Sequence, residues 1–173
     1  MDFLDIARTR QACRSYDPTR EVEQEKIDAI IEAARLAPSA CNSQPYIITV
    51  CTGEKKELVA ETTRKVGMNG FTKDAPVIIV VSEKPEKKGV LGTIVPIDSY
   101  ISVDIGIVAA YLTAEATTQG LGSCIIGWFD DETVRSVCGV EGRTRLVIAL
   151  GYAKEGDPLR PKVRKTRAEL INE

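Results

Sequence analysis

The sequence predicts one domain that mixes helices with strands, of either the α+β or the α/β class. Three observations indicate this. The run Val77–Val81 contains only β-branched residues, which is typical of a strand covered by apolar side chains on both faces. The segment Glu21–Ala37 instead carries apolar residues at helical spacing. No repeat, low-complexity tract or Gly/Ser-rich linker divides the 173 residues, a length that suits a single domain.

The first part of the chain predicts two helices. A short one covers Asp2–Thr9. A second covers Glu21–Ala37, because a series of apolar residues that starts at Ile27 continues at i+3, i+4 and i+7. Three glutamates lie in its first turns, where the helix dipole favours negative charge, and Pro38 ends the helix.

The middle of the chain predicts a strand, a helix and a second strand. Tyr46–Cys51 is rich in β-branched residues and forms the first strand. Lys55–Val66 is helical, with Gly67 as its C-terminal cap. Ala75–Ser82 forms a strand that needs apolar cover on both faces and is therefore central in its sheet. The segment Glu83–Ile97 is charged and interrupted by Gly and Pro, so we expect it on the surface near a substrate entrance.

The segment Ser99–Gln119 predicts a helix with unusual burial. Apolar residues recur every three or four positions from Ile101 and form one stripe, but Val103 and Tyr111 make other sides of the helix apolar too. A helix that is apolar nearly all round must be covered. We therefore expect this one either in the middle of the core or at a subunit interface.

Three further elements complete the predicted domain. Ser123–Gly127 forms a short strand, Asp130–Cys138 a short helix and Arg145–Tyr152 a strand. From about residue 153 to residue 173 the chain is a polar tail with several cations.

Charge and hydropathy exclude several classes of protein. The chain has 23 Lys and Arg residues and 25 Asp and Glu residues, which gives a net charge of −2. A protein that binds nucleic acid is normally basic. Uninterrupted apolar runs such as Val77–Val81 are too short to span a bilayer. The acidic start Met1–Asp5 does not resemble a signal peptide. We therefore expect a cytoplasmic protein with neither nucleic acid nor membrane as a partner.

The chain contains no histidine, which excludes hydrolases that depend on a histidine base and metal sites with histidine ligands. Its five cysteines form no C-x-x-C pair and fit neither a disulfide framework nor a zinc site, so we expect no metal. The dinucleotide fingerprint G-x-G-x-x-G and the P-loop are both missing. Because histidine and paired cysteines are both missing, any difficult chemistry would come from a cofactor.

Four clusters could bind a ligand, and each also has an ordinary structural reading. Arg8–Tyr16 contains three arginines that could clamp a phosphate or form a solvated basic turn. Ala37–Pro45 is rich in hydroxyl and amide groups that could bind the edge of a heteroaromatic ring, or it is an ordinary connection from a helix to a strand. Gly120–Trp128 allows close backbone approach to a ligand, or serves turns. Arg160–Lys165 is a second cationic site or a solvated tail.

The order of these clusters resembles the nitroreductase family of flavin enzymes. The pattern is an Arg-rich N-terminal turn, the loop A-P-S-x-x-N-x-Q-P, a G-L-G strand and a basic C-terminal tail, and it runs from Phe3 to about Lys165. The loop is its most specific part. The resemblance implies an α+β sandwich around a mostly antiparallel sheet, flanked by helices, and a homodimer with FMN at the interface. The helix Ser99–Gln119 would then pack against its mate.

The resemblance also implies which residues bind the FMN phosphate. In the family's R-[RH]-S-x-[RK] motif, the first basic residues and the serine bind phosphate, and the last cation lies by the flavin N1/O2 edge. The corresponding positions here are Arg10, Gln11, Ala12 and Arg14, so a cation and a hydroxyl are replaced. Each missing charge-assisted hydrogen bond costs roughly 1.5–3 kcal/mol. Arg164 and Lys165 match the C-terminal phosphate contacts and would compensate.

Around the flavin ring, the resemblance implies contacts from three further segments. The partner subunit would lay Pro38, Ser39 and Ala40 against the flavin, with Asn42 and Gln44 shaping that loop. Asn69 would read the pyrimidine edge. The strand end whose backbone N–H faces flavin N5 consists of Ile126, Gly127 and Trp128.

The activity that the resemblance implies is FMN-dependent oxidoreduction, in which the flavin carries the chemistry and no protein side chain is catalytic itself. Hydride from NADH or NADPH would pass to the flavin and then to a nitroaromatic, a quinone or a similar small electrophile, in ping-pong turns at one site. Arg14 would stabilise the negative charge that develops near N1/O2. Family relatives that act as dehalogenases or flavin-fragmenting enzymes are alternatives. So are a non-catalytic flavin-binding or redox-regulatory protein, favoured by Gln11 and Ala12, and a thiol switch at Cys41.

Overall fold

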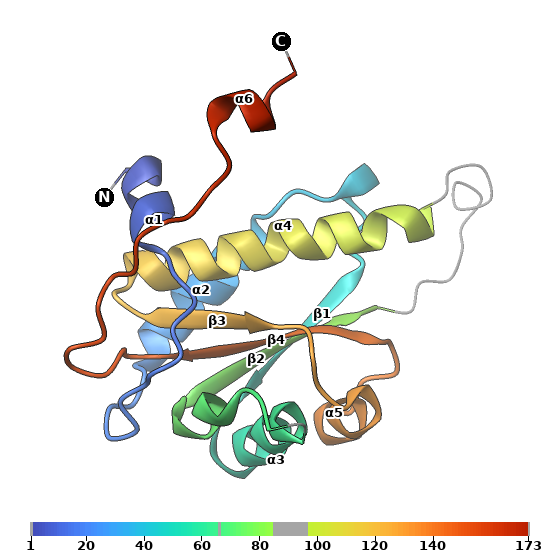
Figure 1. Ribbon diagram of the computed structural model, residues 1–173. Coiled ribbons are helices and arrows are strands. Elements are labelled where there is room, and N and C mark those ends of the chain that lie inside the picture. The colour runs from blue at the N-terminus through green and yellow to red at the C-terminus, as the bar shows by residue number, and fades with distance from the viewer. Residues whose placement is uncertain (1, 66, 85–96, 173) are drawn as a thin grey trace.

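The computed structural model describes residues 2–65, 67–84 and 97–172 (Figure 1). The elements are named as in that figure. The helices are α1 (Phe3–Thr9), α2 (Gln24–Arg35), α3 (Gly53–Arg64), α4 (Ile97–Thr118), α5 (Asp131–Cys138) and α6 (Arg167–Leu170), with short 3₁₀ helices η1 (Ala40–Asn42) and η2 (Gly70–Asp74).

The strands form one antiparallel sheet in the order β1-β2-β4-β3. Its members are β1 (Tyr46–Cys51), β2 (Val77–Glu83), β3 (Gly122–Ile126) and β4 (Thr144–Gly151). All three strand pairings are antiparallel, which confirms the α+β class and excludes α/β. The central place of β2 is confirmed as well, because it pairs with β1 on one side and β4 on the other.

Helices cover both faces of the sheet, and α2 and α4 lie on the face opposite to α3 and α5 (Figure 1). Alternation along β2 explains the two cores. Ile79 packs with the apolar residues of α2 and α4, whereas Ile78 packs with Val59 of α3 and Val134 of α5. The predicted requirement for apolar cover on both faces of this strand is therefore met.

Helix α4 is covered on one side only. Val108 and Leu112 are completely buried against the sheet. On the other side Val103 is 55% exposed and Tyr111 40% exposed. Of the two sequence-based alternatives, the middle of the core is thus wrong for this single chain, because only one stripe of the helix faces the sheet. None of the described helices, α4 included, combines the length and apolarity needed to cross a membrane.

Several predicted boundaries need correction. Helix α2 begins at Gln24 rather than Glu21, because Glu23 has extended backbone angles and is the residue that precedes the first turn. The helix predicted from Asp130 begins at Asp131, since the Asp130 side chain caps it by accepting the Thr133 N–H. The predicted tail holds the one-turn helix α6. Of the predicted surface segment Glu83–Ile97, residues 85–96 lie outside the described residues.

Candidate functional site

The segment after α1 lies along β3, the edge strand next to β4. Ala12 makes a parallel bridge with Ser123, and the Cys13 N–H donates to the Ser123 carbonyl at 2.9 Å. This close approach needs a glycine at position 122, since a Cβ there would come within 2.8 Å of the Cys13 side chain. The sheet edge therefore fixes the position of the Arg-rich turn.

Gln11 fastens the C-terminal tail to this segment. Its Nε2 donates to the Pro158 carbonyl at 3.1 Å, and its Oε1 accepts the Arg160 N–H at 3.0 Å. The Arg160 guanidinium donates to the Ala12 carbonyl at 2.7 Å. Both the nitrogen and the oxygen of the Gln11 side-chain amide therefore bind the backbone of the tail. These bonds hold the cationic N-terminal segment next to the cationic tail, although the two are far apart in sequence.

Four cations gather where the tail crosses the N-terminal segment. Lys162 donates to the Arg10 carbonyl, and a hollow of about 220 Å³ is lined by Arg10, Gln11, Ala12, Arg160, Pro161, Lys162 and Arg164. Partial burial, followed by the positive charges of Arg10, Arg164 and Arg160, lowers the pKa of the Lys162 ammonium. Arg160 pairs with Asp157, but no carboxylate of the described residues pairs with Arg10, Lys162 or Arg164. The cluster therefore favours a bound anion.

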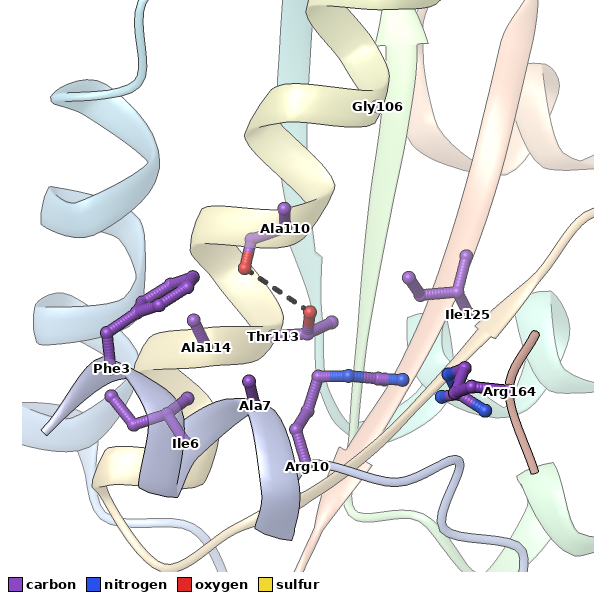
Figure 2. A pocket seen from close by; sticks show the side chains of 10 residues that line it. All are labelled: Phe3, Ile6, Ala7, Arg10, Gly106, Ala110, Thr113, Ala114, Ile125 and Arg164. Atoms are coloured by element: carbon purple, nitrogen blue, oxygen red, sulfur yellow. Dashed lines mark hydrogen bonds between the residues drawn. The ribbon is translucent and has the colours of Figure 1, made fainter. Parts of the chain in front are cut away.

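A larger hollow of about 340 Å³ adjoins this cluster and shares Arg10 and Arg164 with it. Figure 2 shows these two arginines on the β3 side of the hollow and Phe3 and Ile6 of α1 on the other side. Small side chains on one face of α4 leave the space open, and Ile125 of β3 lies on the sheet side. The remaining lining residues are Ala7, Gly106, Ala110, Thr113 and Ala114.

Arg14 belongs to the segment after α1 and lies farther along β3 than Arg10 does. It is exposed, and its guanidinium lies beside Cys124 of β3. Burial raises the pKa of the Cys124 thiol, and the nearby charge of Arg14 acts in the opposite direction. The segment therefore places Arg10 and Arg14 one after the other along the outside of β3.

The residues that were predicted to contact the flavin ring from β3 and η2 line neither of the two hollows. Gly127 and Trp128 follow β3 and are exposed, whereas Ile126 is buried in the core between the sheet and α3. Asn69 has a left-handed backbone, and its amide donates to the Thr63 carbonyl at 3.3 Å. Phe71, two residues later, packs on Tyr16 with ring centroids 6.3 Å apart.

The loop that contains Pro38, Ser39, Ala40 and Asn42 is built on α4. The Ala40 N–H donates to the Asp104 carboxylate at 3.0 Å, and the Ser39 hydroxyl accepts the Gln44 N–H at 2.9 Å. Cys41 and Asn42 both adopt positive φ, and both are exposed. None of the four predicted residues lines either hollow of its own chain.

The structure thus joins some of the predicted residues and adds others. Arg10, Gln11, Ala12 and Arg164 meet, whereas Lys165 is exposed and lines neither hollow. Arg160 and Lys162 belong to the predicted cationic cluster Arg160–Lys165 but were not among the predicted phosphate contacts, and both line the cationic hollow. The signal for this was the alternation Arg160, Lys162, Arg164, since every second residue of an extended chain faces the same way.

Sequence reasoning also missed the small residues of α4. Gly106, Ala110, Thr113 and Ala114 recur at i, i+4, i+7 and i+8, so they share one helix face, and that face lines the larger hollow. Within the described residues there is no group of Cys, Asp and Glu side chains suited to a metal ion.

Comparison with known proteins places this geometry in a family. The model of the nitroreductase family matches residues 7–66 and 55–152. An oxygen-insensitive NADPH nitroreductase of Helicobacter pylori is 25% identical over an alignment of 209 positions that covers 99% of each chain. The crystal structure of a nitroreductase family protein from Streptococcus pneumoniae has a TM-score of 0.85 at 26% identity and covers 99% of this chain and 100% of its own. An FMN-dependent nitroreductase from Clostridium difficile has a TM-score of 0.75 at 28% identity, with 96% and 94% covered.

Proposed function

Because the chain belongs to the nitroreductase family, we propose that it is an FMN-dependent enzyme that uses NADH or NADPH to reduce nitroaromatics, quinones or similar small electrophiles. The observation that carries the proposal is the continuity of the two hollows. A cationic hollow meets an apolar hollow at Arg10 and Arg164, which suits a ligand with a phosphate at one end and a flat ring system at the other.

The residues present fit such a cofactor. Arg10, Lys162 and Arg164 crowd together without a carboxylate from the described residues, and a phosphate would relieve their mutual repulsion. When bound, FMN would accept hydride from the nicotinamide and pass it to the acceptor. In our proposal the cation cluster would hold the phosphate, the apolar hollow would receive the ring system, and Arg14 and Gly127, which lie outside that hollow, would contact the edge of the ring.

The roles of the protein groups are binding, orientation and electrostatics. Arg14, fixed beside β3, would stabilise negative charge that builds up on the ring and so raise the reduction potential of the flavin. Asn69 and the backbone of Gly127 and Trp128 would orient the ring. Because one open site serves the donor and the acceptor in turn, steady-state kinetics should be ping-pong.

We further propose that the site is completed by a second copy of the chain. Val103 and Tyr111 leave an apolar strip of α4 exposed, and burial of such a strip between two copies would be favourable. The loop with Pro38, Ser39 and Ala40 is tied to the same helix at Asp104 and lines neither hollow of its own chain. It is therefore available to cover the flavin site of the partner.

Spectroscopy and turnover of the purified protein test the proposal. Added FMN should show a shifted visible spectrum, NADH or NADPH should bleach it, and a quinone such as menadione or a nitroaromatic should restore it. Arg14→Ala should retain flavin but lower its reduction potential, with Arg20→Ala, a cation outside both hollows, as the matched control. Bound flavin without turnover would instead support the non-catalytic flavin-binding alternative. No binding of FMN would overturn the proposal.

A further inference from the structure

Two cysteines far apart in sequence meet on the side of the sheet covered by α3 and α5. Cys51 is the last residue of β1 and Cys138 the last residue of α5, and their Sγ atoms lie 3.9 Å apart. Cys51 is completely buried, whereas Cys138 is half-buried. A disulfide needs an S–S distance of about 2.05 Å, so the two sulfurs must approach by about 1.9 Å.

The surroundings make the two thiols unequal. The two sulfurs lie within hydrogen-bond distance for sulfur, and either thiol can donate. With Cys51 as the donor, this bond and the nearby Lys55 ammonium lower the pKa of Cys138. The same bond, followed by burial, raises the pKa of Cys51. Because Cys138 is the more exposed sulfur of the pair and the one whose pKa is lowered, we assign it as the attacking sulfur and the buried Cys51 as the resolving one.

From this geometry we propose that Cys51 and Cys138 form an oxidation site that closes to a disulfide when the protein meets a peroxide. In the first step the Cys138 thiolate attacks one peroxide oxygen and the O–O bond breaks. Cys138 becomes a sulfenic acid, and the hydroxide that leaves takes up a proton as water. In the second step the Cys51 sulfur attacks the sulfenic sulfur. The S–O bond breaks, the Cys51 proton joins the leaving hydroxide as water, and the peroxide is reduced by the two electrons that the thiols lose.

The disulfide would join the end of β1 to the end of α5, which are far apart in the sequence. It would close a loop of 87 residue steps between β1 and α5, which constrains the unfolded chain strongly. Helix α5 follows β3 through Gly127 and Trp128, so the cross-link would also restrain one end of that connection. The site lies on the sheet face opposite to α4 and does not depend on the proposed flavin chemistry.

Peptide mapping of the peroxide-treated protein tests the proposal. Trypsin releases Cys51 within residues 36–55, together with Cys41, and Cys138 within residues 136–143. The mapping therefore uses Cys41→Ser, which removes an exposed thiol and leaves Cys51 as the only cysteine of its peptide. After treatment with hydrogen peroxide and alkylation in denaturant, we expect a cross-linked peptide pair and the loss of two alkylatable thiols per chain.

Reversibility and stability provide the second readout. The oxidised protein should have a higher Tm than the reduced protein, and dithiothreitol should reverse both the cross-link and the Tm shift. In the Cys41→Ser background, the additional change Cys138→Ala should abolish the cross-linked pair. The absence of this peptide pair after oxidation, or overoxidation of Cys138 to sulfinic acid without a cross-link, would overturn the proposal.

Discussion

Replacement of Arg10 by alanine tests the phosphate site most directly, because Arg10 lines both hollows. A charge-assisted hydrogen bond contributes about 1.5–3 kcal/mol, and a tenfold change in affinity corresponds to about 1.4 kcal/mol. The Kd for FMN should therefore rise by roughly 10- to 150-fold in Arg10→Ala. The free protein should lose no stability, since the change removes one of several like charges around Lys162.

Flavin fluorescence provides the assay, because titration of each variant measures the Kd. Riboflavin lacks the phosphate, so its affinity should be nearly the same in Arg10→Ala and in the unmodified chain. Lys165→Ala is the matched control, since Lys165 is an exposed cation of the same tail that lines neither hollow. Its Kd for FMN should not change.

Two results would refute the reasoning about Arg10. If FMN and riboflavin lost affinity equally, Arg10 would act on the ring or on the shape of the site and not on the phosphate. If Lys165→Ala weakened FMN binding as much as Arg10→Ala, the position of the tail described above would be wrong. A salt titration adds an independent check, because a phosphate contact weakens as ionic strength rises.

Two further changes have defined outcomes. Because the pKa of Lys162 is lowered from 10.5, the folded free protein binds fewer protons than the unfolded chain just below that pH. Its unfolding free energy should therefore rise with pH in this window while FMN affinity falls, and Lys162→Met should flatten both profiles. Gly142→Ala would place a Cβ 1.8 Å from the Glu83 carbonyl oxygen, so it should lower the unfolding free energy measured in urea by about 3 kcal/mol or more. Gly70→Ala is the control, because a Cβ at position 70 enters open space and should change the unfolding free energy little. Equal effects of the two substitutions would contradict the close packing at Gly142.

The strands could be predicted because their β-branched, apolar residues are typical of buried strands. Tyr46–Cys51 is confirmed to the residue, and the unbroken apolar run Val77–Val81 explains why that strand has a core on each face. The start of α2 was less predictable. Its glutamates suit both the first helical turn and the residues just before it, so charge alone could not show that the helix begins after Glu23.

The candidate site was predictable in part. The resemblance brought Arg10 and Arg164 to one site, and the structure places them together. The sequence did not show which tail cations line the cationic hollow, because the face that an extended tail presents depends on how the tail is held in place. Hydrogen bonds between Gln11 and the tail decide this, and they join residues about 150 positions apart.

The same hydrogen bonds give a physical reason for the departure at position 11. A second arginine or a histidine there would add a charge next to Arg10, whereas Gln11 offers one donor and one acceptor to the tail backbone. The tail that it fastens carries Lys162 to the Arg10 carbonyl and Arg164 to the rim of both hollows. The positive charge missing from the N-terminal motif is thus replaced from the C-terminal side, so the glutamine does not argue against an anion site at this place.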